Sequence, residues 1–166
     1  MSCKVIIMGA GGRMGGTLVR LARAGGDFEL AGVVERPDRL GEVQSLGCPA
    51  AGNLDALLPQ APGAVIIDFT APEASVDMAR TAKRHGNPAV IGTTGLTPEQ
   101  QEELRSIARD VPLFWSPNMS VGVNVLLKVL PELTRMLGPA YDLEMFEVHH
   151  NRKKDAPSGT AIKLAQ

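Results

Sequence analysis

The sequence predicts an α/β fold in which a parallel sheet carries helices on both faces. Short, β-branched apolar stretches alternate with stretches of helical periodicity over roughly the first 120 residues. These strands are apolar along their whole length, which is typical of parallel strands buried on both sides. A third observation is the glycine-rich stretch at residues 9–16, which joins the first predicted strand to the first predicted helix.

The predicted elements follow one another in a regular order. Residues 3–8 form a first strand that leads directly into the glycines, whereas a signal peptide would need a longer apolar core and a small-residue cleavage site. Residues 13–24 are helical and place Met14, Leu18 and Leu21 on one face. Further strands are predicted at 28–35, 64–69, 88–92 and 112–116, and further helices at 72–84 and 97–109.

Local signals mark where two of these helices begin. Pro72 and Pro98 suit first helical turns, and Thr97 opens a T-x-x-Q capping pattern that ends at Gln100. Residues 36–63 are rich in Pro and Gly and weakly periodic, so we expect loops there and a short helix around residues 53–58.

The pattern changes near residue 120, so we divide the chain into a dinucleotide-binding domain, 1–120, and the start of a second, α+β domain, 121–166. A long apolar helix is expected after Ser120, ending near Leu137, and Pro131 should cost it a hydrogen bond and bend it. Its buried stripe is expected to consist of Val125, Leu126, Val129, Leu130, Leu133 and Leu137.

The end of the chain contains one more predicted strand and the start of a helix. Residues 141–148 alternate polar and apolar side chains, which suits a strand with one solvated or ligand-facing side. A polar loop follows, and Ser158 is a good N-cap for a helix that is beginning where the sequence stops.

Composition excludes several classes of protein. The net charge is −1 and the sequence pI is about 6.3, which does not favour nucleic acid or a membrane surface as a partner. No apolar run approaches the roughly 18 residues of a membrane span. Cys3 and Cys48 form neither a disulfide framework nor a metal motif, so we interpret them as free thiols in a reducing cytoplasm.

The glycine stretch has glycines spaced by three, at Gly9, Gly12 and Gly15. Gly9 would permit a tight turn, Gly12 close approach to a ligand, and Gly15 close packing of helix on strand. Such a loop at a helix N-terminus attracts a pyrophosphate and is typical of the Rossmann fold, although a glycine-rich turn without ligand remains an alternative.

Charged residues at the end of the second predicted strand support the nucleotide interpretation. Glu35 lies 20 residues after Gly15, where an acceptor for ribose hydroxyls is expected. Arg36 follows directly and is suited to a 2′-phosphate, whereas a solvated turn is the alternative. The stretches "IGTTG" (91–95) and "SPNMS" (116–120) follow later strands and suit a flat ring against the backbone, or else are ordinary turns.

The loop "EVHHNRKKDAPSGTA" combines two histidines, several cations and a helix start. His149 and His150 are adjacent and point opposite ways on an extended chain, and no third ligand lies at metal spacing, so a metal site is disfavoured. Gly159 and Thr160 follow the N-cap and offer backbone N–H groups to an anion. The combination suits a small carboxylate, with a solvated basic loop as the alternative.

These motifs together resemble one family. "GAGGRMG", "ER" at 35–36, "IDFT", "IGTTG", "NMSVGVN" and above all "HHNRKKDAPSGTA" are similar to the bacterial and plant dihydrodipicolinate reductases, now called 4-hydroxy-tetrahydrodipicolinate reductases. The resemblance implies reduction of a cyclic imine dicarboxylate by NADH or NADPH, giving tetrahydrodipicolinate in the diaminopimelate route to lysine. It also implies a homotetramer in the cytoplasm.

The resemblance assigns roles to particular residues. His149 is implied as the proton donor and acceptor, Lys153 as a second proton donor, and His150, Gly159 and Thr160 as ligands of substrate carboxylates. The implied cofactor-binding residues are Gly9, Ala10, Gly11, Gly12, Arg13, Met14, Glu35, Arg36, Gly92, Thr93, Thr94, Ser116, Pro117, Asn118 and Met119. The family commonly has Ala-Ala or Ser-Ala where this chain has Ser116-Pro117.

Family members are considerably longer, so the resemblance implies an N-terminal domain plus the first strand and substrate loop of a second. We expect 166 residues alone to bind NADH weakly and to show no turnover, because an unpaired strand is marginal. Two other functions compete with the reductase. Another amino-acid dehydrogenase should lack the "HHNRKKDAPSGT" loop, and a non-catalytic nucleotide sensor should lack a cationic dicarboxylate loop.

Overall fold

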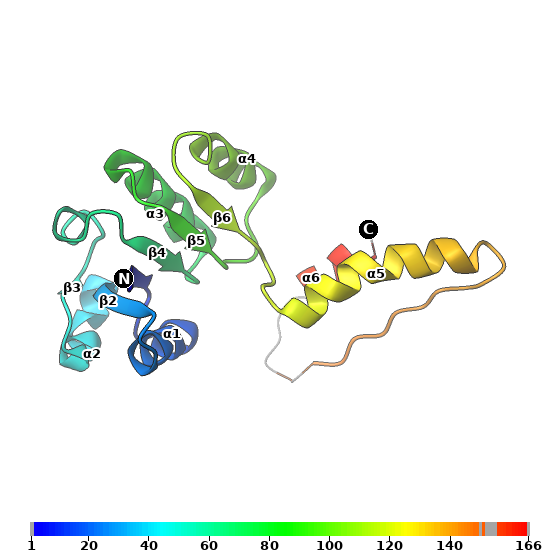
Figure 1. Ribbon diagram of the computed structural model, residues 1–166, viewed down its shortest axis with the longest axis horizontal. Helices are drawn as coiled ribbons and strands as arrows, with labels where there is room; N and C mark the ends of the chain where they lie inside the picture. The colour runs from blue at the N-terminus through cyan, green and yellow to red at the C-terminus, as the bar shows by residue number, and fades with distance from the viewer. Residues whose placement is uncertain (1, 150, 152–155, 166) are drawn as a thin grey trace. The chain divides into compact units, whose positions relative to one another are not determined.

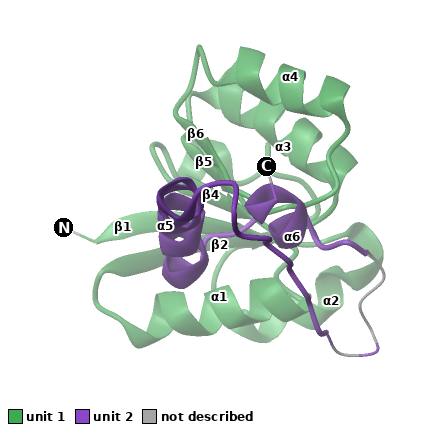
Figure 2. Cartoon of the chain, turned by 90° about the vertical axis from the view of Figure 1, so that its right-hand side faces the viewer, with its two compact units in different colours: residues 1–116 green, residues 117–166 purple. Residues whose placement is uncertain are grey.

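The computed structural model describes residues 2–149, 151 and 156–165, and its ribbon is shown in Figure 1. The chain forms two compact units, Met1–Ser116 and Pro117–Gln166, coloured separately in Figure 2. No helix within the described residues combines the length and the apolar character needed to cross a membrane.

The first unit is built on a sheet of six parallel strands in the order β3-β2-β1-β4-β5-β6. The chain therefore continues on opposite sides of β1 in its two halves, and ligands of such sheets bind at the carboxyl ends of the strands beside this switch point. The strands are β1 (Cys3–Met8), β2 (Phe28–Val34), β3 (Ala50–Ala51), β4 (Val65–Asp68), β5 (Ala89–Ile91) and β6 (Leu113–Trp115). The predicted parallel α/β fold is confirmed.

Helices cover both faces of this sheet, as the sequence predicted, with α3 and α4 on one side and α1 and α2 on the other (Figure 2). Neighbouring residues of β1 divide between two apolar clusters, because successive side chains of a strand point to opposite faces. Val5 and Ile7 join Val19 of α1, whereas Ile6 joins Val76 of α3 and Leu104 of α4. The helices are α1 (Arg13–Ala24), α2 (Leu40–Val43), α3 (Pro72–His85) and α4 (Pro98–Ile107).

The helix starts at Pro72 and Pro98 are confirmed. Thr97 accepts the N–H of Gln100 while the Gln100 side chain accepts the N–H of Thr97, which is a complete capping box. Both prolines occupy the first turn of their helices, where their missing N–H costs nothing.

The helix α1 packs through a face that only partly matches the apolar stripe in its sequence. Its buried residues are Gly15, Val19 and Ala22, and Leu18 is half-buried against the same cluster, whereas Met14 and Leu21 are exposed. A Cβ on Gly15 would lie 2.1 Å from the carbonyl oxygen of Gly9, so the start of the helix lies directly against the loop and turns the face of Gly15 and Val19 inward.

The region between β2 and β4 differs from the prediction. The expected helix around 53–58 is wrong, since residues 55–57 form a turn and a 3₁₀ turn, η3, follows at Leu58–Gln60. The short strand β3 and the helix α2 were not predicted, nor were the 3₁₀ turns η1 (Pro37–Arg39) and η2 (Gln44–Leu46). Strand β3 has two residues, too few to show a period, and it exists because it pairs with β2.

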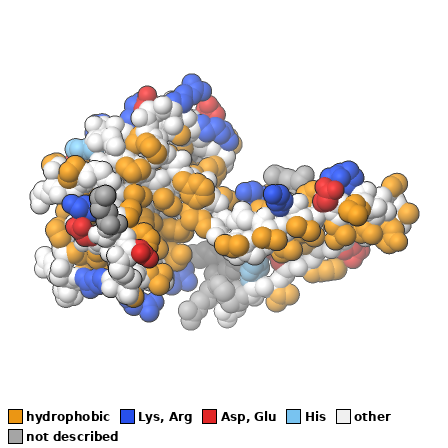
Figure 3. All heavy atoms as spheres, in the orientation of Figure 1, with side chains coloured by type: hydrophobic (Ala, Val, Ile, Leu, Met, Phe, Trp, Pro, Cys, Tyr) orange, Lys and Arg blue, Asp and Glu red, His pale blue; other side chains and the backbone are white. Residues whose placement is uncertain are grey.

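The second unit contains α5 (Val121–Leu137) and α6 (Gly159–Leu164), with Ser120 and Ser158 as their N-caps, as predicted. The predicted strand at residues 141–148 is wrong. These residues form no regular secondary structure, because they pair with no strand among the described residues. The predicted buried stripe of α5 is also wrong. No residue of this helix is buried: Leu130 is half-buried, and Val125, Leu126, Val129, Leu133 and Leu137 are exposed at the surface (Figure 3), because the short helix α6 covers too little of that face.

Candidate functional site

The glycine loop between β1 and α1 adopts a conformation that requires glycine at two positions. Gly9 has a φ of +63°, in the left-handed region that other residues avoid. The Cβ of any residue replacing Gly15 would lie 2.1 Å from Gly9 O and 2.8 Å from Ala10 Cα, both backbone atoms that cannot move aside. The roles predicted for Gly9 and Gly15, a tight turn and close packing of helix on strand, are therefore present in the structure.

The N-terminus of α1 is suited to an anion. Gly12 is its N-cap and provides no side-chain acceptor, and its first turn contains no acidic residue. The other long helices of the described chain differ, because α4 and α5 are capped by hydroxyl groups and α3 has Glu73 in its first turn. A helix start without such an acceptor leaves its N–H groups and its dipole available to a phosphate. The loop therefore fits a pyrophosphate.

Glu35 lies immediately after β2 and beside this loop, with an exposed fraction of 5%. Its Oε2 accepts the N–H of Gly11 at 2.8 Å, and its Oε1 accepts the N–H of Arg36 at 3.0 Å. The carboxylate is thus fixed by two backbone donors before any ligand binds. Each oxygen keeps a second lone pair for a ribose hydroxyl.

Two arginines follow Glu35, and each has a carboxylate partner. Arg36 is exposed and donates to Asp38, with 3.1 Å between Nε and Oδ1, and these hydrogen bonds lower the pKa of Asp38. Arg39 donates to Glu42 and, at 3.3 Å, to the carbonyl of Gly11. A 2′-phosphate at Arg36 would compete with Asp38. Sequence reasoning missed this carboxylate, although acidic residues two or three positions from an arginine in a turn often reach it.

The predicted nicotinamide-end segment, Gly92–Thr94, follows β5 at the carboxyl edge of the sheet. Thr93 is buried and Thr94 is exposed. The indole N–H of Trp115 donates to the carbonyl of Thr93 at 3.1 Å, which joins the ends of β5 and β6. Ser116 belongs to this unit, and its N–H donates to the carbonyl of Ile91 at 3.1 Å.

In the second unit, Asn118 and Thr160 meet although 42 residues separate them. The amide of Asn118 donates to Thr160 Oγ1 at 2.9 Å, and its Oδ1 accepts the N–H of Ser120. Pro117 and Met119 flank Asn118, and Gly159 begins α6 beside Thr160. The structure therefore brings a predicted cofactor residue against a predicted substrate residue.

The described part of the histidine loop is organised by Glu147. Its Oε2 lies 2.9 Å from Nε2 of His149, and its Oε1 accepts the N–H of Ser158 at 2.8 Å. Ser158 in turn caps α6 by accepting the N–H of Ala161. His150 and Lys153 lie outside the described residues. Sequence reasoning missed Glu147, although a residue two positions before His149 lies on the same side of an extended chain.

We expect the Glu147 carboxyl to titrate near pH 2. Hydrogen bonds lower the pKa of Glu147 from 4.5 to about 2. The largest effect comes from the side chain of Ser158, followed by the side chain of His149 and the backbone of Ser158. A lowered pKa in the folded state means that this link stabilises the loop above pH 4.5 and is lost as the pH falls through 2. NMR titration of the side-chain carboxyl measures this midpoint.

The control for this titration is Ser158→Ala, which removes the first of these contacts and should move the midpoint back towards 4.5. A wild-type midpoint near 4.5 would contradict the observed contacts.

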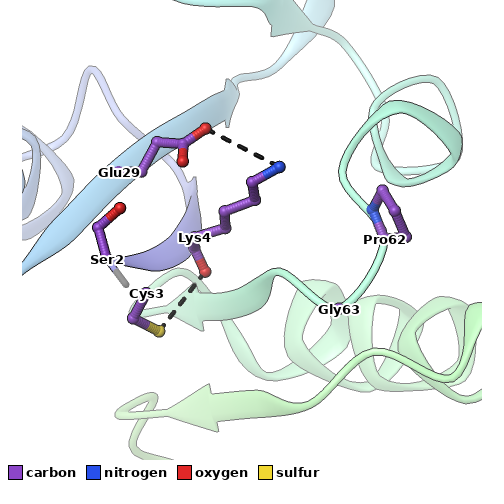
Figure 4. Close-up of a pocket in the computed structure, with 6 residues that line it drawn as sticks. All are labelled: Ser2, Cys3, Lys4, Glu29, Pro62 and Gly63. Carbon is purple, nitrogen blue, oxygen red and sulfur yellow. Dashed lines mark hydrogen bonds and ion pairs between the residues drawn. The ribbon is translucent and has the colours of Figure 1, made fainter.

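A cavity of about 500 Å³ lies elsewhere on the first unit. Its lining includes Cys3 and Lys4 at the start of β1, Glu29 at the start of β2, and Pro62 and Gly63 before β4 (Figure 4). These positions are at the amino ends of the strands, and the glycine loop is at the carboxyl ends. The cavity is therefore separate from the candidate nucleotide site.

The strand order, the glycine loop and the placement of Glu35 define the first unit as a Rossmann-type dinucleotide-binding domain. Solved dehydrogenases share this fold; for example, myo-inositol 2-dehydrogenase from Lactobacillus plantarum superposes with a TM-score of 0.63 over 80% of this chain and 42% of its own, at 14% identity.

Family comparison is more specific. Residues 3–119 match the model of the dihydrodipicolinate reductase N-terminus, and residues 122–166 match that of its C-terminus. The chain belongs to the dihydrodipicolinate reductase family.

Relatives and solved structures agree with this assignment. The 4-hydroxy-tetrahydrodipicolinate reductase of Nitratidesulfovibrio vulgaris (strain DP4) is 63% identical over all 166 residues. A structure of dipicolinate-bound dihydrodipicolinate reductase from Paenisporosarcina sp. TG-14 matches 99% of this chain and 64% of its own, with a TM-score of 0.77 and 30% identity. This chain spans 64% of the length of the N. vulgaris relative.

Proposed function

We propose that the complete protein transfers a hydride from NADH or NADPH to 4-hydroxy-tetrahydrodipicolinate or dihydrodipicolinate, giving tetrahydrodipicolinate in the diaminopimelate route to lysine. The observation that carries the proposal is the family-specific loop at 147–160, in which Glu147 holds His149 beside the capped start of α6. The N. vulgaris relative that shares this whole stretch of chain is named as this reductase.

The predicted cofactor-binding residues each contact a different part of the dinucleotide. Gly9–Met14 and the N-terminus of α1 hold the pyrophosphate, and Glu35 accepts the adenosine ribose hydroxyls. Gly92–Thr94 and Ser116–Met119 flank the nicotinamide end. Bound NAD(P)H supplies the hydride.

The residues of the second unit act on the substrate. Glu147 holds Nε2 of His149, which leaves Nδ1 of the imidazole to exchange a proton with the substrate. Lys153 is the second proton donor, and His150, Gly159 and Thr160 bind the substrate carboxylates. Cationic and hydrogen-bonding groups of this kind suit a dicarboxylate. The homotetramer and the cytoplasmic location remain predictions.

The test of the proposed function is NADH oxidation in the presence of freshly generated dihydrodipicolinate. It should be run on this chain and on a polypeptide extended to the length of its relatives. Substrate-dependent oxidation by the longer polypeptide supports the proposal, and its absence from a folded preparation that binds NADH would exclude it.

Use of both NADH and NADPH is part of the proposal, and Arg36→Ala tests it. We expect NADPH binding to weaken about tenfold, because a charge-assisted contact with the 2′-phosphate is lost, and NADH binding to stay nearly unchanged. Isothermal calorimetry with both cofactors measures the difference.

The matched control is Asp38→Asn, which frees Arg36 from its carboxylate partner and should strengthen NADPH binding without affecting NADH. Equal losses for both cofactors in Arg36→Ala would refute the assignment of Arg36.

A further inference from the structure

A buried carboxylate lies at the carboxyl end of β4 and has no role in the function described above. Asp68 has no exposed surface. Its Oδ1 accepts the N–H of Thr70 at 3.1 Å and the Thr70 hydroxyl at 2.6 Å. Its Oδ2 accepts the hydroxyl of Ser75, and Thr93 Oγ1 lies 3.4 Å away. All four of these donors are neutral groups, so the buried carboxyl group is held by hydrogen bonds alone.

These contacts converge on the segment after β5. The hydroxyl oxygens of Ser75 and Thr93 lie 2.7 Å apart, and the backbone carbonyl of Asp68 accepts the N–H of Gly92 at 2.8 Å. Trp115 holds the Thr93 carbonyl from β6. These hydrogen bonds therefore fix the side chain and the carbonyl of Thr93 and the N–H of Gly92. The next residue, Thr94, is exposed.

The two residues after Asp68 make close contacts with both halves of the nucleotide site. A Cβ on Gly92 would lie 1.9 Å from Cε1 of Phe69, so the Phe69 ring packs directly on that glycine. A Cβ on Gly9 would lie 2.9 Å from the methyl group of Thr70. The segment 68–70 thus connects the glycine loop to the segment after β5.

We propose that Asp68 is a positioning residue for the nicotinamide end of the cofactor. It fixes Gly92–Thr94 through Ser75 and Thr93, and the segment 68–70 joins these residues to the glycine loop. A carboxylate suits this task because it accepts four donors at once from three separate segments of the chain. The proposal rests on the proposed function, in which Gly92–Thr94 contacts the nicotinamide.

The experiment compares the affinities of the full chain for NADH and for ADP-ribose, which lacks the nicotinamide. In Asp68→Ala and in the milder Ser75→Ala, we expect NADH affinity to fall about tenfold while ADP-ribose affinity stays unchanged, because only the segment after β5 is released. Asp68→Asn should restore part of the NADH affinity, because the amide is the same size and the two hydroxyls can accept from it.

The control is Asn87→Ala. Asn87 is another buried polar residue of the same unit, and its amide donates to the carbonyls of Ala61 and Ala64, away from the nucleotide site. The Asn87→Ala substitution should lower the melting temperature of the protein without changing its affinity for NADH or for ADP-ribose. If Ser75→Ala weakens the binding of both ligands equally, or keeps the wild-type preference for NADH, the positioning role is excluded. A wild-type chain with no preference for NADH over ADP-ribose would instead overturn the proposed nicotinamide site itself.

Discussion

Replacing His149 by Gln in the full-length polypeptide is expected to lower kcat by about 10²–10⁴-fold, the usual contribution of a positioned acid. Hydride transfer leaves negative charge on the substrate, and that charge must be protonated. Glutamine keeps a hydrogen-bonding group near Glu147 but cannot exchange a proton. Steady-state kinetics with dihydrodipicolinate measures the change.

NADH affinity should be unaffected by this substitution, because His149 is bonded to Glu147 and is not among the predicted cofactor-binding residues. The comparison variant is His150→Gln, which should mainly raise the substrate KM, since His150 is proposed to bind a carboxylate. If His149→Gln keeps most of its kcat, the proton comes from another residue.

Replacing Gly15 by Ala is expected to destabilise the protein by about 3 kcal/mol or more and to abolish nucleotide binding. The new methyl group would lie 2.1 Å from Gly9 O, and neither the strand nor the loop can move away without breaking the sheet. Overpacking against backbone is at the costly end of the range for such substitutions. Urea unfolding measures the stability, and calorimetry measures the binding.

The matched control is Gly25→Ala at the other end of α1. Gly25 has a φ of −108°, and nothing lies within 4 Å of a Cβ placed there. Alanine should be neutral or slightly stabilising at this position, by up to about 1 kcal/mol, because it restricts the unfolded chain. Similar losses at both positions would mean that the close packing at Gly15 is not what limits the site.

Where the sequence predictions were right, the signal was local. Most elements contain enough residues to show an apolar period or a cap. These are the strands β1, β2, β4, β5 and β6 and the helices α1, α3, α4 and α5. At β3 and at residues 141–148, where the predictions failed, the outcome depended on a distant partner. β3 exists because β2 lies beside it, and residues 141–148 form no strand because the described chain offers them none.

The sequence by itself determined the parallel α/β class, the glycine loop and the family, because each depends on residue types at fixed short spacings. Only the tertiary structure decided which groups hold the site residues in place. Glu35 reaches Gly11 across 24 residues, and Asp68 reaches Thr93 across 25. Such contacts depend on strand order and register, which are set by packing of the whole sheet. The contacts of Asp68 therefore became visible in the fold and not in the motifs.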